Sequence, residues 1–251
     1  MALWKSMVVA RADLRMAMKV KMVKYGLVMM AAMAPIMLIG LALLFAISAP
    51  AFAASMIAML DPVMSPVIGI MVIIPASMIS ANALVGEKEQ NTLEALLCTP
   101  LTDRELLIGK VLSSFIPTIA LLLGSVLVTE IATIIILTSV GAQAILFPGL
   151  SSLFLLLVAG PILIAAVVSV MVLISGRVKR VYEAYQASGA VVMVLLIPLI
   201  LPMLSISNTG NVDMNLVWLS DIFTLLIASV LAIVTWVLAI RRFNRDKIVS
   251  M

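Results

Sequence analysis

The chain has 251 residues, of which 64% are hydrophobic and 11% are charged, and its formal net charge at pH 7 is +4. Soluble domains average about 45–50% apolar and about 25% charged residues, so this composition excludes an ordinary soluble protein and predicts a membrane protein. The single cysteine, Cys98, excludes an internal disulfide, and the absence of histidine removes the commonest metal ligand and the usual general base, so we expect no catalytic residue, metal site or cofactor in this chain.

Residues 1–24 form a basic N-terminal segment. Arg11, Arg15 and Lys19 recur at i, i+4 spacing, with apolar residues on another side, which is the pattern of an amphipathic helix lying at a membrane interface. A basic flank that only sets membrane topology would carry the same charges. Both interpretations stay open.

Six apolar runs reach the length of about 20 residues that crosses a membrane as a helix. The strands of a membrane barrel would alternate apolar and polar residues, whereas these runs are apolar on every face, so we predict an all-α fold with residues 25–251 as one six-span domain. The sequence ISAPAFAAS resembles a signal-peptide cleavage site near Ser55, but the apolar run that precedes it is longer than the roughly 7–15 residues of a signal peptide. We expect the first run to be retained. The runs cover approximately residues 25–49, 63–85, 111–140, 151–175, 186–205 and 217–240.

Basic residues are confined to alternate connections of this six-span arrangement. Every Lys and Arg lies before the first run, after the second, after the fourth or after the sixth. Because such residues are retained on the cytoplasmic side, we expect both termini to be cytoplasmic. Asp61, Glu130, Asp213 and Asp221 then fall toward the opposite face.

Residues 86–110 form the largest predicted cytoplasmic loop. Asn91 and Glu94 have the spacing of a helix N-cap and a carboxylate that reaches back to it. A short amphipathic helix is expected there, with an apolar edge made by Leu93, Leu96 and Leu97.

Pro100 should end this short helix, and Thr102 with Glu105 supplies a capping box for the next one. The loop is therefore expected to run from a span through a short cross-helix and a turn into the next span. The alternative interpretation is a solvated hairpin that binds no partner.

The sequence EKEQNTLEALLCTPLTDRELLIGK resembles the signature of the ABC-2 family of ATP-binding-cassette transporter permeases. In that family a span ends in an acidic-basic-acidic triplet, followed by Gly-Thr-Leu-Glu, paired leucines, a Thr-Pro or Ser-Pro turn, and Glu-Leu-Leu before Gly-Lys. Asn91 stands where the family usually has glycine, and asparagine also suits a left-handed or capping position. The matching residues are Glu87, Lys88, Glu89, Thr92, Leu93, Glu94, Leu96, Leu97, Thr99, Pro100, Glu105, Leu106, Leu107, Gly109 and Lys110.

A second stretch, SGRVKRVYEAYQASG, is similar to the family's other cytoplasmic connection, here residues 176–185. The resemblance implies that this connection gives a second contact through Arg177, Arg180 and Glu183. It also implies a transport pathway between the second and fifth spans of two subunits, for which Ser77, Ser80 and Asn82 are candidates.

The resemblance implies a permease subunit whose ATPase is a separate chain that binds ATP and Mg. The fragment RELLIGKV has Arg104 and Val111 where a phosphate-binding loop needs glycine and a hydroxyl, so we expect no ATP hydrolysis by this chain alone. The implied ATPase-coupling residues are Glu87, Glu89, Asn91, Thr92, Leu93, Glu94, Leu96, Leu97, Pro100, Glu105 and Lys110.

We therefore expect a multi-pass exporter subunit in the cell membrane of a prokaryote. Its expected partners are the ATPase, a second permease copy or close paralogue, and membrane lipid, with no nucleic acid. One alternative is an ATP-independent secondary transporter or channel, which usually places charges near the membrane midplane, whereas these spans are nearly free of charge. Another alternative is an assembly subunit that moves no substrate.

Overall fold

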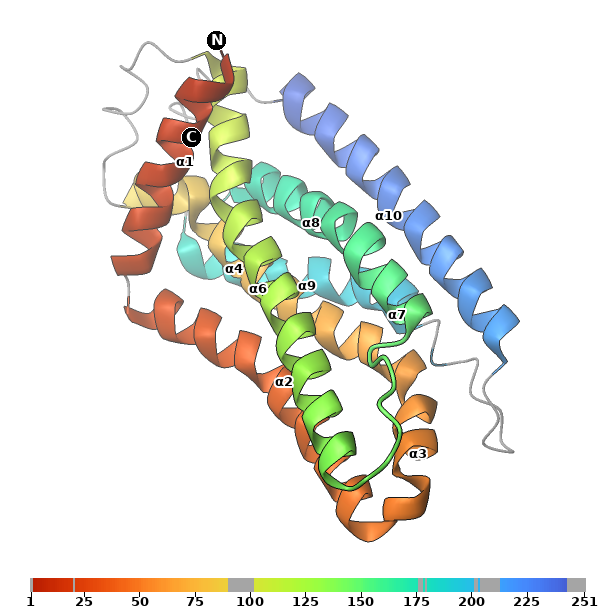
Figure 1. Ribbon diagram of the computed structural model, residues 1–251. Coiled ribbons are helices and arrows are strands. Elements are labelled where there is room, and N and C mark those ends of the chain that lie inside the picture. Colours follow the sequence, from red (N-terminus) through yellow and green to blue (C-terminus); the bar gives the residue numbers. More distant parts are fainter. Residues whose placement is uncertain are drawn as a thin grey trace.

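The computed structural model describes residues 2–19, 21–89, 102–175, 178, 180–200, 203 and 213–242. These residues are almost entirely helical and include no strand, in agreement with the predicted all-α fold (Figure 1). The helices are α1 (Ala2–Lys19), α2 (Lys21–Ser48), α3 (Ala53–Met59), α4 (Asp61–Glu89), α6 (Asp103–Ser139), α7 (Leu150–Phe154), α8 (Gly160–Ser175), α9 (Val181–Ile200) and α10 (Met214–Arg242).

Among the described residues, 5 helices are long and apolar enough to cross a membrane. They correspond to the first, second, third, fourth and sixth predicted spans, with ends that differ by a few residues. Helix α9 covers most of the predicted fifth span but is not one of these five, so the six-span count stays a prediction. The five segments are Lys24–Ser48, Asp61–Ala81, Glu105–Ser139, Leu150–Ser175 and Met214–Ala239.

The fourth span contains a local irregularity. A π-helical turn, η2 (Leu155–Ala159), joins α7 to α8. Pro161 follows after Gly160, and because proline has no backbone N–H it cannot make the regular helical hydrogen bond to the preceding turn. The wider turn therefore precedes the proline that interrupts the regular hydrogen bonding.

Helix α4 lies at the centre of the bundle, and α10 lies at its edge. The most apolar stretch of α4 is 65% buried within the chain, against 22% for that of α10. The buried face of α4 repeats every four residues, through Met64, Ile68, Val72 and Ala76, all at most 2% exposed. A matching stripe on α2 includes Ala34, Leu38, Ala42 and Ala46.

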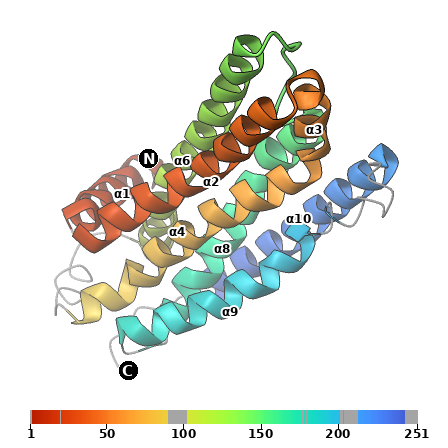
Figure 2. The same ribbon diagram turned by 90° about the horizontal axis from the view of Figure 1, so that it is seen from below.

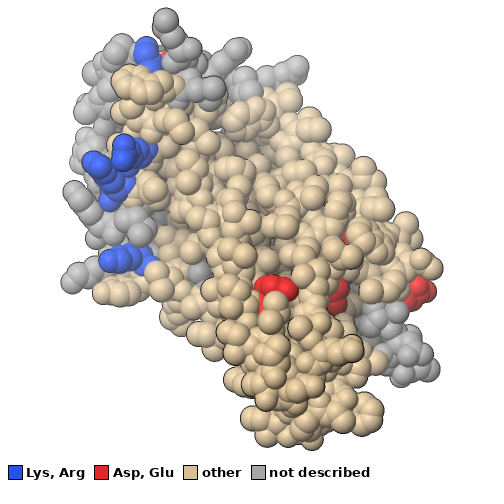
Figure 3. Space-filling model, viewed as in Figure 1, with Lys and Arg blue, Asp and Glu red and all other residues tan. Residues whose placement is uncertain are grey.

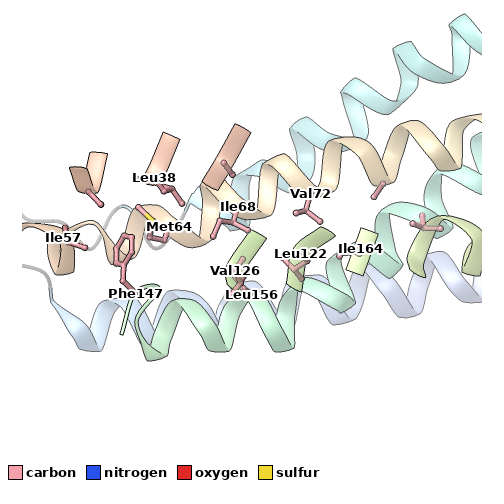
Figure 4. Close-up of a cluster of buried hydrophobic side chains, with 14 of the residues drawn as sticks. Leu38, Ile57, Met64, Ile68, Val72, Leu122, Val126, Phe147, Leu156 and Ile164 are labelled. Atoms are coloured by element: carbon pink, nitrogen blue, oxygen red, sulfur yellow. The ribbon is translucent and has the colours of Figure 1, made fainter. Parts of the chain in front are cut away.

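The main core cluster forms where these stripes meet α6 and the fourth span. Figure 4 shows Leu38, Ile68 and Val72 converging with Leu122, Val126 and Leu156. The alanines on α2 are small, and small residues allow membrane helices to approach closely. Packing of this kind holds the middle of the bundle together without polar contacts.

The two ends of the bundle differ in charge. The start of α1, the end of α4, the start of α6 and the end of α8 lie toward one end, whereas α3, α7 and the start of α10 lie toward the other (Figures 1 and 2). In the space-filling view, Lys and Arg gather at the first end, and the Asp and Glu atoms that are drawn in red lie mostly toward the second (Figure 3). The charge segregation of the sequence is thus present in three dimensions, while the orientation in a membrane stays a prediction.

Candidate coupling site

The start of α6 has the capping box that the sequence predicted. The Thr102 hydroxyl accepts a hydrogen bond from the Glu105 backbone N–H at 3.3 Å, and Glu105 Oε2 accepts one from the Thr102 N–H at 2.9 Å. Two N–H groups that a helix start leaves unpaired are satisfied in this way. Leu106 and Leu107 then enter the core at 1% exposure each, so the helix begins in a fixed position.

Helix α1 packs directly against this first turn of α6. The Ser6 hydroxyl donates a hydrogen bond to the Glu105 carbonyl oxygen at 3.0 Å. At Gly109 a Cβ atom would lie 2.8 Å from Val9 Cβ and 3.0 Å from the Ser6 carbonyl oxygen. Only glycine leaves room for so close an approach without displacing α1. This contact explains the presence of glycine at position 109 independently of its place in the family signature.

A buried ion pair completes the contact between α1 and α6. Lys110 Nζ lies 3.0 Å from Asp13 Oδ2, and the two side chains are 1% and 14% exposed. Burial raises the pKa of the Asp13 carboxyl, and the Lys110 ammonium opposes that rise. Removing one member of such a pair leaves an uncompensated charge, so the pair constrains how α1 sits on α6.

The sequence did not predict this role for α1. The helix itself is present, and Lys5, Arg11 and Arg15 are exposed on it, which is compatible with the expected basic surface. Asp13, however, is the first acidic residue of the chain and stands alone among basic ones. That isolation is the signal from which a buried partner for Lys110 could have been suspected.

The end of α4 is tied to the end of α8 by one hydroxyl. Ser175 Oγ accepts a hydrogen bond from the Val85 N–H at 3.0 Å and donates one to the Ala81 carbonyl oxygen at 2.9 Å. The predicted coupling loop leaves from α4 just beyond Val85, and the second cytoplasmic connection leaves from α8 just beyond Ser175. Sequence analysis did not single out Ser175, because one serine in an apolar run carries no pattern.

Most of the predicted coupling residues fall outside the described part of the chain. Glu87 and Glu89 belong to the last turn of α4. Glu105 is 8% exposed and Lys110 is 1% exposed, and both side chains engage groups of this chain. The expected short cross-helix therefore stays a prediction, since the residues outside the description include Asn91, Thr92, Leu93, Glu94, Leu96, Leu97 and Pro100.

The second predicted contact is partly described. Arg180 is exposed immediately before α9, and its carbonyl oxygen accepts hydrogen bonds from the N–H groups of Glu183 and Ala184. Glu183 is exposed in the first turn, and Ala184 is fully buried. Arg177 lies outside the described residues.

Two of the three candidate pathway residues on α4, Ser77 and Ser80, are buried within this chain's own bundle. Ser77 and Ser80 are 1% and 0% exposed, and their hydroxyls donate to the carbonyl oxygens of Ile74 and Ala76. Serines that bond to their own helix in this way have no immediate need of a ligand. The side chain of Asn82 is outside the description, and a pathway role for the three stays a prediction.

Comparison with known families agrees with this arrangement. The family model described as ABC-2 family transporter protein matches residues 7–216. The chain belongs to the ABC-2 transporter family. No curated protein matches the sequence. The matched region of this ABC-2 protein begins within α1, just after Ser6, and ends within the first turn of α10, so it includes the ion pair between Asp13 and Lys110 and the residues that follow α4. Proteins of this family are membrane components of transporters rather than catalytic enzymes in themselves.

Proposed function

We propose that this ABC-2 protein is the permease subunit of an exporter, coupled through residues 86–110 to a separate ATPase subunit that binds ATP and Mg. The observation that carries the proposal is the rigid support on both sides of that loop. Its first end is tied by Ser175, and its second end is fixed by the capping box and by α1. A loop held in this way transmits a push from a bound subunit into two spans.

The coupling residues divide into two roles under this proposal. Leu93 and Leu97 are the apolar anchors that enter the ATPase surface, and Glu94 meets basic or amide groups there. Glu105 and Lys110 act from within, because their side chains already engage Thr102 and Asp13. A coupling element of this kind needs two discrete positions, and nucleotide binding to the ATPase shifts the balance between them. The internal contacts make the loop and α6 move as one body.

Transport runs between two copies of the chain, or between this chain and a close paralogue, in a prokaryotic cell membrane. Outward transport is favoured because most transporters that this chain resembles move substrates outward, and nothing in the described residues suggests a docking site for a substrate-delivering protein. The abundant exposed apolar side chains on α2, α9 and α10 suit a surface shared between lipid and a second permease copy. An ATP-independent transporter or an assembly subunit predicts no nucleotide-dependent movement of cargo.

The deciding experiment compares three variants of the tagged chain with the ATPase subunit that co-purifies with it. Leu97→Ala and Glu94→Ala should reduce ATPase co-purification or uncouple hydrolysis from transport, while membrane insertion and thermal stability stay near wild type. Truncating a buried interface anchor typically costs about 2 kcal/mol or more, which is roughly a 30-fold weaker complex. Gln90→Ala is the matched control in the same loop. If both variants behave like the control, the loop is not the coupling element.

A topology experiment tests the orientation independently. In a Cys98→Ser background, cysteine is placed at Lys5, exposed on α1, or at Gln143, exposed in the connection before α7. The positive-inside distribution predicts that an impermeant thiol reagent added to whole cells labels only the second site. Labelling of both sites from outside would disprove the proposed orientation.

A further inference from the structure

The end of the bundle that lies away from the start of α6 contains two buried carboxylates that form no ion pair with a Lys or Arg among the described residues. Asp61 begins α4 and is 7% exposed, and Asp221 lies in the second turn of α10 and is 1% exposed. In the sequence, residues 49–62, 141–150 and 206–216 contain no Lys or Arg. Burying charge without a counter-charge costs several kcal/mol per ion even after the surroundings relax, so the pair requires an explanation.

Asp61 has a structural role that accounts for its own burial. Its Oδ1 accepts a hydrogen bond from the Gly149 N–H at 2.6 Å, and its Oδ2 accepts one from the Ser151 hydroxyl at 3.0 Å. The Ser152 hydroxyl donates to the Asp61 backbone carbonyl at 2.8 Å. These bonds anchor the start of the fourth span to the start of α4, and each carboxylate oxygen keeps a further lone pair.

Asp221 has no such role. Neither of its carboxylate oxygens has a hydrogen-bond partner in the described structure. Asp61 lies close to it in the fold, because Asp61 is bonded to Ser151 of α7, and Phe154 of the same helix contacts Trp218, one turn before Asp221. The buried carboxylate of Asp221 thus lies within electrostatic reach of a second carboxylate, with both of its oxygens available.

From this arrangement we infer that Asp61 and Asp221 form a binding site for a hard divalent cation, with Ca²⁺ and Mg²⁺ as the two candidate ions. Two carboxylates carry two negative charges, which one divalent ion neutralises. The described residues contain no group of three or more His, Cys, Asp or Glu side chains that could hold a metal ion, so the ion would complete its coordination with hydroxyl, carbonyl and water oxygens. Divalent Ca²⁺ and Mg²⁺ accept sets of that kind.

Such an ion would add a polar link to the packing that already holds α10 against α8. Asp61 belongs to α4 and is bonded to α7, whereas Asp221 belongs to α10, the least buried of the five candidate spans. Phe154 of α7 and Trp218 of α10 lie beside this junction, with ring centroids 5.6 Å apart. The cation would fix the outer end of α10 against the fourth span, independently of any ATPase.

Trp218 also makes the site directly observable, because it lies one helical turn before Asp221. In chelator-treated protein in lipid nanodiscs, Tb³⁺ replaces the native ion and emits when a nearby tryptophan is excited. Wild type should show saturable Tb³⁺ emission, and competing Ca²⁺ or Mg²⁺ should quench it, the more effective ion identifying the preferred cation. The same ion should raise the melting temperature of the wild type by a few degrees.

Three variants decide the inference. Asp221→Asn should lose the Tb³⁺ emission and the thermal shift, and Trp218→Phe should lose the emission but keep the shift. Asp213→Asn is the control, because Asp213 is an exposed acid at the same helix start and asparagine caps a helix equally well; it should keep both signals. Unchanged emission in Trp218→Phe overturns the site even if Asp221→Asn does not fold. The inference is also overturned if added cations do not change the melting temperature of the wild type and Asp221→Asn is more stable than the wild type in chelator. That result would indicate that Asp221 is buried as a protonated acid.

Discussion

Substitution of Gly109 by alanine tests whether α1 is truly seated on α6. The added methyl group would lie 2.8 Å from Val9 Cβ, 2.9 Å from Val9 Cγ1 and 3.0 Å from the Ser6 carbonyl oxygen. Two of these atoms are bound closely to the backbone of α1 and cannot rotate away. The substitution therefore forces the helices apart at the point where they also share the ion pair between Lys110 and Asp13.

The expected magnitude is a balance of two terms. Overpacking a well-packed contact costs about 1–3 kcal/mol. Alanine in place of glycine in a helix interior returns about 1 kcal/mol of helix propensity. Gly109→Ala should therefore lower the free energy of unfolding by about 0–2 kcal/mol, taking the difference of those terms.

A matched control isolates the steric term. Gly124 lies on the same helix, and a Cβ atom there would have no neighbour within 4 Å. Gly124→Ala should gain the propensity term alone and be more stable than Gly109→Ala by about 1–3 kcal/mol. The free energies are measured by unfolding in mixed detergent micelles. In a Val9→Gly background the penalty at Gly109 should shrink, because the two nearest atoms are absent. If Gly109→Ala is as stabilising as Gly124→Ala, the close approach of α1 is wrong.

Three further substitutions test the remaining contacts. Lys110→Met should lower the free energy of unfolding by about 3–5 kcal/mol, because it leaves the Asp13 carboxylate buried without a partner. The double variant Lys110→Met with Asp13→Asn should lose less stability than the single variant, because no buried charge remains. A double variant that is less stable than Lys110→Met alone contradicts this reasoning. Ser175→Ala should lower the free energy of unfolding by about 1–3 kcal/mol, because it removes both hydrogen bonds that join α8 to α4. Ser169→Ala should be near neutral, because the Ser169 hydroxyl bonds back to its own helix. Equal effects of the two substitutions would refute the link between α4 and α8. Thr102→Ala should cost about 1 kcal/mol, and thermal unfolding unchanged from wild type would show that the capping box contributes nothing.

Local signals explain what the sequence predicted well. The span limits follow from the length of each apolar run, and the capping box follows from two residues three apart, so neither depends on tertiary contacts. The long-range polar contacts had no such signal. Ser6 and Glu105 are 99 residues apart, and Asp61 and Ser151 are 90 residues apart. The local sequence around each residue does not indicate which distant residue it contacts.

The faces of the helices were also beyond prediction. Amphipathic helices of soluble proteins reveal their buried side by alternation of polar and apolar residues, but these spans are apolar all round. Whether Leu38 or Ile36 of α2 faces the core cannot be read from hydropathy, although the structure buries the first and leaves the second 67% exposed. Small residues such as Ala42 and Ala46 mark the packed face, and their four-residue spacing was the one usable clue.

The polar contacts divide the described bundle into two units that meet at the predicted coupling loop. Asp61 holds one end of α4 to the start of the fourth span, and Ser175 holds the other end of α4 to the end of that span. Helices α1 and α6 form the second unit through Ser6 and Lys110. Between the units the core offers mainly apolar contacts, which are non-directional and oppose small displacements less specifically than hydrogen bonds do. Residues 90–101 join α4 of the first unit to α6 of the second in the sequence, so a force applied to this segment would act between the units, as the proposed coupling requires.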